Sequence, residues 1–358
     1  MKAVVFYNVG DIRYEPQWSE PRPLKPDEVR IATSWCGICG TDMEDYKKGA
    51  IIPIGKPHPE SGRMAPLVIG HEYSGRIIEL GAQVEGLEIG QRVALECVRR
   101  CGRCYCCKTG DYAACINQVS VGQVDDGGMA DCFNIPAEDC VPLPDSLPDD
   151  EAALAEPLAV MLRGVRKGRV QVGEVVTVLG AGSIGLCGIA VARVAGASQV
   201  ISLTHGGYRA EAARQMGAST VLDTREAGWK EAFYDLTHGL GSDVVIDTGG
   251  TVEAMRQAVE LTRRQGRCVI NSVVDADVSF NALDIMLNEK ELIGTCAHQA
   301  NREISWAVQF MTDRRIDVRP IITDRIYIAD AVEKGFDRLL TDRTQVKILV
   351  TPHRDWLK

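Results

Sequence analysis

Four cysteines stand close together in a stretch that is rich in glycine and charged residues. They follow the pattern C-x2-C-x2-C-x7-C and are Cys101, Cys104, Cys107 and Cys115. Four thiolates at such short separations can surround one tetrahedral Zn²⁺ and leave no coordination position open. A set of buried or oxidisable thiols is the alternative, which this spacing disfavours. We therefore predict a structural zinc site in which the neighbouring Cys97 and Cys106 take no part.

A second set of metal-binding residue types is dispersed along the chain. Cys39 lies in the run GICGTD, His71 and Glu72 follow a glycine in GHE, and Glu156 precedes a proline. A thiolate, an imidazole and a carboxylate suit a catalytic zinc that keeps one coordination position open. Taken singly, the histidine is usually a structural hydrogen-bond partner and the glutamate an ordinary loop residue. Their combination with the four-cysteine cluster favours a metal site.

A glycine-rich loop separates an apolar strand from a helix of apolar periodicity. The strand Val175–Leu179 runs into the loop residues Gly180, Ala181, Gly182, Ser183, Ile184 and Gly185, which fit G-x-G-x-x-G. The first glycine permits the tight turn, the second lets a pyrophosphate approach the backbone, and the third lets helix and strand pack closely. The helix N-terminus stabilises the phosphate charge. The context favours a dinucleotide-binding loop over a merely structural turn.

The end of the next strand lacks the acidic residue that commonly binds the adenosine ribose of NAD. It continues instead with Thr204 and His205, and Arg209 follows soon after. A carboxylate there would repel the 2′-phosphate of NADP, so its absence removes a repulsion and offers hydrogen-bond donors. The alternative is that Arg209 is only a solvated helix residue. We expect NAD or NADP as the cofactor, with a slight preference for NADP.

The elements that must position these residues differ between the two halves of the chain. Residues 1–150 contain short β-branched runs between turns, which predicts a β-rich domain with long loops. From about residue 151, strands alternate with helices, which predicts an α/β domain with a doubly wound parallel sheet. We expect strands in the first part at 29–33, 68–69, 75–79 and 92–94. In the second part we expect strands at 175–179, 200–203, 220–222, 244–247 and 268–271, and helices at 183–195, 209–216, 229–238 and 253–263. The remaining residues, 297–358, predict two helices and a strand at 346–350 that could return to the first domain.

The composition is that of an ordinary globular protein. The 358 residues are enough for two domains, and 45% are hydrophobic and 25% charged. A net charge of −9 argues against a nucleic-acid partner. No run approaches the roughly 18 apolar residues that cross a bilayer, and we expect a cytoplasmic protein. Thirteen cysteines, an odd number, are more consistent with metal ligands than with a disulfide framework.

Taken together, the motifs GICGTD, GHE, CGRCYCC, AEPLAV and GAGSIG resemble the zinc-containing medium-chain dehydrogenase family, in that order and over essentially the whole chain. The stretch between Cys39 and His71, with the run HPESG at 58–62, is most similar to the butanediol dehydrogenase branch. Sorbitol and threonine dehydrogenases are close alternatives. The resemblance implies a GroES-like catalytic domain over 1–156, a Rossmann cofactor domain over 157–296 and a return segment of the catalytic domain over 297–358.

The resemblance also implies roles for single residues. Cys39, His71 and Glu156 would be ligands of the catalytic zinc, and Glu72 an adjacent carboxylate able to exchange with water or Glu156. Cys36 would be a packing residue. The implied reaction is the reversible oxidation of a secondary alcohol to a ketone, with the zinc lowering the pKa of the hydroxyl and the nicotinamide accepting hydride. Thr41 would exchange a proton with that hydroxyl, and Asp42 would orient His71.

One residue departs from the family pattern. Relatives often carry a histidine five residues after the zinc-binding cysteine, whereas this chain has Glu44. Three interpretations stay open: Glu44 relays a proton, attracts a hydroxyl-rich or cationic substrate, or is an inert surface residue.

The expected function is therefore that of a zinc dehydrogenase for a diol, polyol, sugar acid or amino alcohol, with two zinc ions per chain. Two alternatives share the fold: a zinc-free quinone or enoyl reductase, and a nucleotide-binding protein without catalysis. The intact ligand set and Thr41 disfavour both. The family implies a homodimer or homotetramer joined through the cofactor domains, by strands near residues 269–272 and 292–295.

Overall fold

The computed structural model describes residues 1–357, which fall into two units. The first unit contains residues 1–159, 297–313 and the chain from Ile322 onward, and the second contains residues 160–296 and 314–321. The chain thus leaves the first unit and later returns to it. Among the described residues, no helix combines the length and the apolar character needed to cross a membrane.

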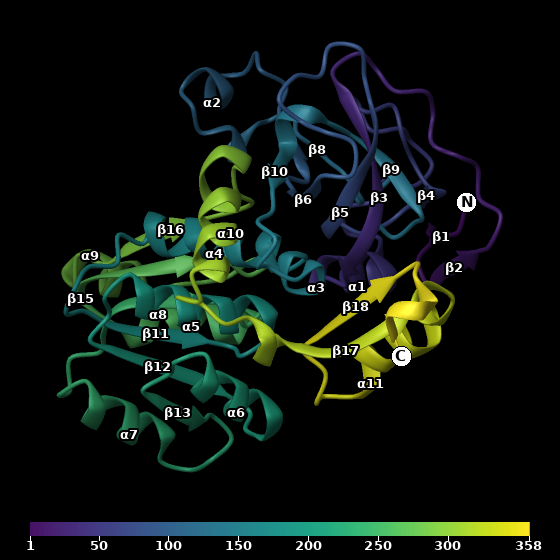
Figure 1. Ribbon diagram of the computed structural model, residues 1–358. Coiled ribbons are helices and arrows are strands. Elements are labelled where there is room, and N and C mark those ends of the chain that lie inside the picture. Colours follow the sequence, from purple (N-terminus) through teal and green to yellow (C-terminus); the bar gives the residue numbers. More distant parts are fainter. Residues whose placement is uncertain (358) are drawn as a thin grey trace. The chain divides into compact units, whose positions relative to one another are not determined.

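The larger sheet of the first unit has the strand order β10-β6-β5-β3-β18-β17, and β9 also pairs with β3. β3 is the central strand, antiparallel to β5, β9 and β18. The return segment therefore completes this sheet, and Figure 1 shows its strands β17 and β18 in yellow beside one another. The strands are β3 (Glu28–Gly37), β5 (Glu72–Leu80), β6 (Arg92–Leu95), β9 (Cys132–Pro136), β10 (Cys140–Pro142), β17 (Ile322–Tyr327) and β18 (Lys347–Thr351).

Two smaller sheets and five α-helices also belong to the described part of the first unit, together with short 3-10 and π helices. One sheet has the order β2-β1-β4 and the other pairs β7 with β8. Their strands are β1 (Ala3–Asn8), β2 (Asp11–Glu15), β4 (Leu67–Val68), β7 (Val98–Arg99) and β8 (Val119–Ser120). The helices are α1 (Gly40–Lys48), α2 (Tyr105–Lys108), α3 (Asp149–Ala152), α10 (Ser305–Thr312) and α11 (Arg338–Thr341). A further helix, α4 (Ala155–Lys167), begins in the first unit.

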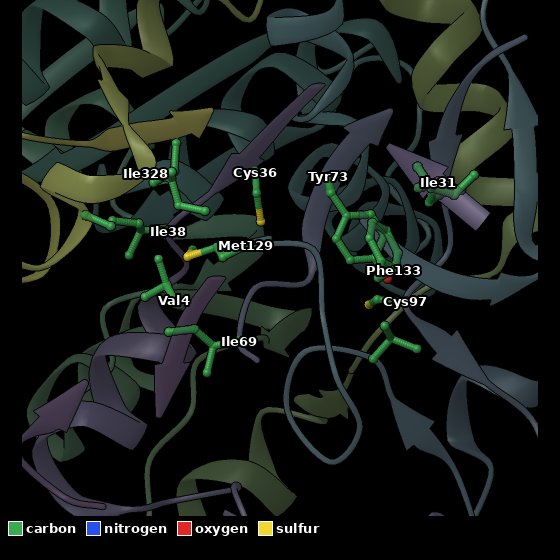
Figure 2. Close-up of a cluster of buried hydrophobic side chains, with 14 of the residues drawn as sticks. Val4, Ile31, Cys36, Ile38, Ile69, Tyr73, Cys97, Met129, Phe133 and Ile328 are labelled. Carbon is green, nitrogen blue, oxygen red and sulfur yellow. The ribbon is translucent and has the colours of Figure 1, made fainter. Parts of the chain in front are cut away.

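The core of the first unit forms because strand residues with apolar side chains bury them against one another. Figure 2 shows this cluster, in which the rings of Tyr73 and Phe133 lie 4.7 Å apart. Cys36 is fully buried in the same cluster, and Figure 2 shows it close to Met129. The interpretation of Cys36 as a packing residue is therefore confirmed.

The second unit confirms the predicted parallel sheet, with the order β13-β12-β11-β14-β15-β16. The order reverses at β11, which has β12 on one side and β14 on the other. Ligands of doubly wound sheets bind at the carboxyl ends of the strands at such a reversal. The strands are β11 (Val175–Leu179), β12 (Gln199–Thr204), β13 (Thr220–Asp223), β14 (Ser242–Asp247), β15 (Thr262–Ile270) and β16 (Glu291–Gly294). The helices are α5 (Ser183–Val194), α6 (Gly207–Gln215), α7 (Trp229–Leu236), α8 (Val252–Leu261) and α9 (Ala282–Leu287).

Some elements differ from the sequence prediction. α8 ends two residues earlier than expected, because Thr262 begins β15 and its hydroxyl donates a hydrogen bond to the carbonyl of Ala258 in the last turn of the helix. β16 corresponds to the strand that we expected near residues 292–295. β17 was not predicted, because it carries Asp324 and Arg325 in its middle and so lacks the apolar alternation that marks a strand.

Candidate active site

The site begins where β3 ends. Cys39 is the N-cap residue of α1, and its backbone N–H donates to Oδ2 of Asp42, 2.8 Å away. The other oxygen of that buried carboxylate, Oδ1, lies 3.3 Å from Nδ1 of His71. One carboxylate thus fixes the backbone of the cysteine and faces the ring of the histidine, which is the relationship that we expected between Asp42 and His71.

His71 is buried and presents its second nitrogen to α1. Nε2 lies 3.2 Å from Oγ1 of Thr41. Potential ligand atoms of Cys39, His71 and Glu72 all lie within 4.8 Å of one another. Burial alone would lower the pKa of His71, but the Asp42 carboxylate and Cys39 beside it raise that pKa well above its ordinary value. The structure thus brings together five of the residues that the sequence selected from two separate motifs.

Glu72 is held by a buried lysine from the return segment. Nζ of Lys347 donates to Oε1 and Oε2 of Glu72, at 2.7 and 2.5 Å, and to the carbonyl of Ile38 at 2.9 Å. Burial raises the pKa of Glu72, although the Lys347 charge opposes this. The neighbouring Gly37 makes room, because a Cβ there would lie 2.3 Å from Oε2 of Glu72. Both oxygens of Glu72 are therefore engaged by an ammonium group.

Glu156 has a different partner, which the sequence analysis did not identify. Its Oε1 lies 2.9 Å from Nε2 of His298. Nδ1 of that ring lies 2.9 Å from Oε1 of Glu96, which also accepts a hydrogen bond from the N–H of Val98. His298 and Glu96 are completely buried and Glu156 is nearly so. Burial alone would lower the pKa of His298, but the charge of Glu96 raises it well above its ordinary value. A doubly protonated ring donates one hydrogen bond to each carboxylate.

Two neighbours complete the surroundings of His298. Sγ of Cys97 lies 3.9 Å from Nε2 of His298, and burial raises the pKa of Cys97 to about 11. The next residue along the chain, Gln299, is buried and donates from its amide to the carbonyl of Gly110, 2.9 Å away. Gly110 lies between two cysteines of the four-cysteine cluster.

The four-cysteine cluster forms as expected from its spacing. The Sγ atoms of its four cysteines all lie within 4.8 Å of one another, and Cys106 is not part of the group. Sγ of Cys104 lies 3.5 Å from Sγ of Cys107 and 3.8 Å from Sγ of Cys115. Hydrogen bonds from the N–H groups of Cys107 and Ile116 lower the pKa of Cys104 to about 6. Four sulfurs this close together fit a metal site.

Glu44 does not join the catalytic cluster. Its carboxylate lies 3.3 Å from Nζ of Lys47 and 3.0 Å from Nζ of Lys48, on the same helix. Burial raises its pKa, but the two lysines outweigh this and lower it. These contacts favour the surface interpretation of Glu44 over a proton relay.

In the second unit, the glycine-rich loop connects β11 to α5, as predicted. A Cβ at Gly185 would lie 2.0 Å from the carbonyl oxygen of Gly180, so helix and strand approach closely only with glycine. At Gly182, by contrast, a Cβ would meet nothing within 4 Å, which leaves this side of the loop open. The hydroxyl of Ser183, at the start of α5, is buried without a hydrogen-bond partner. An open loop and an orphan hydroxyl at a helix N-terminus fit a phosphate group. The predicted loop residues 180–185, which include Ile184, thus run without a break from the end of β11 into the first turn of α5.

The ribose end of the loop contains two residues that the sequence analysis missed. Thr204 pairs with Asp223, the last residue of β13, in the parallel register. The Asp223 carboxylate accepts from Nε and Nη2 of Arg225, at 2.9 and 2.6 Å, and these bonds lower the pKa of Asp223 to about 2. A Cβ at Gly206 would lie 2.6 Å from Oδ2 of Asp223 and 3.0 Å from Nη2 of Arg225. An acid and an arginine therefore lie beside the turn that contains His205, and Arg209 lies on α6 just beyond.

Comparison with known proteins places these sites in a family context. A sequence model described as "Alcohol dehydrogenase GroES-like domain" matches residues 25–145, and one described as "Zinc-binding dehydrogenase" matches residues 183–313. The (R,R)-butanediol dehydrogenase of Bacillus subtilis is 32% identical over 99% of this chain and 100% of its own length. The sorbitol dehydrogenase of Halalkalibacterium halodurans is 30% identical over 98% of this chain and 99% of its own.

Solved structures agree with the curated relatives. The crystal structure of 2R,3R-butanediol dehydrogenase from Bacillus subtilis has a TM-score of 0.90, with 32% identity, and covers 98% of this chain and 99% of its own. A structure described as a zinc-binding dehydrogenase from Sinorhizobium meliloti 1021, bound to NADP, has a TM-score of 0.89 and 29% identity, and covers 98% of this chain and 99% of its own.

Proposed function

Because the chain belongs to the zinc-binding alcohol dehydrogenase family, we propose that it oxidises a secondary alcohol of a small diol or polyol. The enzyme is a zinc-dependent oxidoreductase that uses NAD(P). In the reaction, a secondary alcohol and NAD(P)⁺ give a ketone, NAD(P)H and a proton. The carbon atom loses a hydride to the nicotinamide, and the hydroxyl loses its proton. The diol and polyol assignment is supported by the names of the relatives, butanediol and sorbitol dehydrogenases.

The observation that carries this proposal is the joint orientation of Cys39 and His71 by Asp42. We assign Cys39, His71 and Glu156 as the protein ligands of a catalytic zinc, with Glu72 held back by Lys347. A zinc ion there acts as a Lewis acid that lowers the pKa of an alcohol hydroxyl. Asp42 keeps the His71 ring oriented with Nε2 directed toward the metal.

Thr41 is the residue that we assign to the proton. Its Oγ1 lies 3.2 Å from Nε2 of His71, which is itself one of the proposed metal ligands. A hydroxyl both donates and accepts, so Thr41 can exchange a proton with the substrate hydroxyl. Glu44 has no part in this proposal, because its carboxylate is paired with two lysines on the surface of α1.

We further propose that each chain binds two zinc ions, the second in the four-cysteine cluster. Four sulfurs at the distances described can saturate a tetrahedral ion, so this second ion has no open position for substrate. Its role is structural.

For the cofactor we propose a preference for NADP over NAD. Arg225 supplies a guanidinium beside the turn at Thr204, where a 2′-phosphate is expected. The Asp223 carboxylate, which binds that guanidinium, works in the opposite direction and keeps the preference small. The NADP bound in the Sinorhizobium meliloti structure supports the assignment.

A second copy of the chain is the proposed partner. β16 lies at the edge of the six-stranded sheet, whereas β15, which contains residue 269, lies inside it. Beside this edge strand, α9 exposes apolar side chains: Leu283 is 56% exposed, Met286 62% and Leu287 59%. An edge strand and an apolar helix face favour pairing with an identical surface.

A substrate panel tests the proposed function. The purified protein is supplied with vicinal diols, polyols, amino alcohols and sugar acids, each with NAD and with NADP, while its zinc content is measured. We expect the highest kcat/KM for a diol or polyol, and about two zinc ions per chain. Reduction of a quinone or an enoyl compound by a zinc-free preparation would instead favour the reductase alternative, and zinc without turnover of any alcohol would favour a non-catalytic protein.

A further inference from the structure

The buried residues Glu96, His298 and Glu156 form a continuous chain in which two carboxylates flank one imidazole. The distances are 2.9 Å from Glu96 to Nδ1 and 2.9 Å from Nε2 to Glu156. Their side chains are at most 9% exposed. Burying two carboxylates and a ring is unfavourable unless their polar atoms are paired, so the position of His298 depends on these contacts.

The backbone beside His298 carries a second cost. Ala297 has a φ of +55°, in the left-handed region that residues with a Cβ rarely adopt. Such strain persists only where surrounding contacts hold the segment in place. On the C-terminal side of His298, Gln299 is fixed by its hydrogen bond to Gly110. Contacts of the neighbouring backbone therefore hold His298 in place, in addition to the hydrogen bonds of its own ring.

The contact between Glu96 and His298 resembles the contact between Asp42 and His71, except that His298 is not itself a proposed zinc ligand but contacts one. There a carboxylate faces the ring of a proposed zinc ligand; here Glu96 faces a ring whose other nitrogen meets the carboxylate of Glu156. A carboxylate that is fixed at one oxygen keeps the other free in a defined direction. Partners that orient a metal ligand in this way typically contribute a factor of about 10–100 to metal affinity.

We propose that His298, held by Glu96, is a positioning residue that fixes Oε1 of Glu156 and leaves Oε2 directed for the catalytic zinc. The inference rests on the proposed role of Glu156 as a zinc ligand. Glu72 differs from Glu156 in that Lys347 engages both of its oxygens. His298 thus acts on Glu156, and Lys347 acts on Glu72.

Two variants distinguish the roles of the two ring nitrogens of His298. Gln places its terminal amide near the position of Nε2 and can still donate to Glu156, whereas Asn reaches only the position of Nδ1 and Glu96. We expect His298→Asn and His298→Leu to bind the catalytic zinc about 10–100-fold more weakly, as measured by competition with a chelator, and His298→Gln to stay within about threefold of the wild-type protein. Zinc retained by the four-cysteine cluster shows in each variant that the fold is intact.

A double-mutant comparison shows whether His298 acts through Glu156. In the background of Glu156→Ala, the change His298→Leu should cause no further loss of zinc affinity, because the carboxylate that it positions is gone. If Glu156→Ala alone leaves zinc affinity unchanged, the proposed ligand set is wrong. If Glu156→Ala weakens binding but His298→Leu does not, only the positioning role is wrong.

Cys97→Ala is the matched control, since its sulfur is 3.9 Å from the same nitrogen. We expect its zinc affinity and zinc content to equal those of the wild-type protein. Glu96, Cys97 and His298 also have ligand atoms within 4.8 Å of one another. A third zinc per chain that Cys97→Ala removes would mean that this cluster binds metal itself and would overturn the positioning role. Should His298→Leu fail to fold, Glu96→Gln tests the contact at the other nitrogen of the same ring, and undiminished zinc affinity in that variant would count against the proposal.

Discussion

The ammonium group of Lys347 and the carboxylate of Glu72 form a buried ion pair, with side chains that are only 2% and 1% exposed. They are the first residues of β18 and β5, which both pair with β3. Residues 275 positions apart are thus joined beside the proposed metal ligands. The return segment therefore contributes a charge to the site as well as a strand to the sheet.

Replacing Lys347 by Met should destabilise the protein strongly. The change leaves the Glu72 carboxylate buried without a counter-charge, a situation that typically costs about 3–5 kcal/mol. Urea unfolding of the zinc-loaded protein measures this. The double variant Lys347→Met with Glu72→Gln should recover most of the loss, because the buried charge is then absent. A single variant as stable as the wild-type protein would show that the pair is unimportant.

Cys104→Ser should lower stability more than activity. Loss of one of four thiolates opens the structural site, so the zinc content should fall from about two to about one per chain. If the loss is about 3 kcal/mol, the Tm falls by roughly 6–12 °C. Cys106→Ser is the control, because Cys106 lies between Cys104 and Cys107 in the sequence but is not part of the four-cysteine cluster. Full zinc content in a stable Cys104→Ser protein would refute the assignment.

Arg225→Ala should change the cofactor preference. Removal of a charged donor to the 2′-phosphate is expected to lower kcat/KM with NADP about 10–100-fold, equivalent to about 1.5–3 kcal/mol, and to leave the value with NAD nearly unchanged. Asp223→Asn should act in the opposite direction, since it removes a carboxylate that repels the phosphate. Arg214→Ala, also in the second unit, serves as the control. Equal losses with both cofactors would contradict the proposal.

Leu292→Lys should shift the oligomeric state toward the monomer. Leu292 lies on the edge strand β16 and is 38% exposed, so a charge there opposes pairing with a second copy. Light scattering after gel filtration measures the mass of the wild-type protein and of the variant. Leu240→Lys changes a leucine that is 69% exposed elsewhere in the second unit and should have no effect. A wild-type protein that is already monomeric would remove the proposed interface.

Glu28 should make stability depend on pH in the acid range. Burial raises its pKa, but hydrogen bonds from Arg22 and the N–H of Lys25 outweigh this and lower it to about 2. Because the folded pKa is below the ordinary value of 4.5, the stabilisation is complete above about pH 4.5 and is lost as the pH falls toward 2. The wild-type protein should therefore exceed Glu28→Gln in unfolding free energy at pH 7 by more than at pH 3. Comparing the two proteins at each pH cancels the effect of zinc loss in acid. A constant difference would contradict the assignment.

Much of the fold was predictable because it rests on local patterns. The glycine loop from Gly180 to Gly185 lies between one strand and one helix, and its spacing alone carries the signal. Cys39 and His71 are recognised by motifs that contain their immediate neighbours. Lys347 and His298 show no such pattern, since each is a single polar residue whose partner lies more than 100 positions away.

The residues near the expected ribose position were missed for a different reason. The sequence analysis searched for an acid at the end of β12, but the acid that lies there, Asp223, ends the neighbouring strand β13. Parallel pairing places the ends of β12 and β13 side by side, so a side chain from one strand can serve the position of the other. The strand order of the sheet must therefore be known before an acid on a neighbouring strand can be recognised.

Gln299 and His298 are consecutive, yet one is bonded to Gly110 in the cysteine lobe and the other to Glu156. One short segment of the return chain therefore contacts the surroundings of both proposed metal sites, so a change in its backbone would reach both of them.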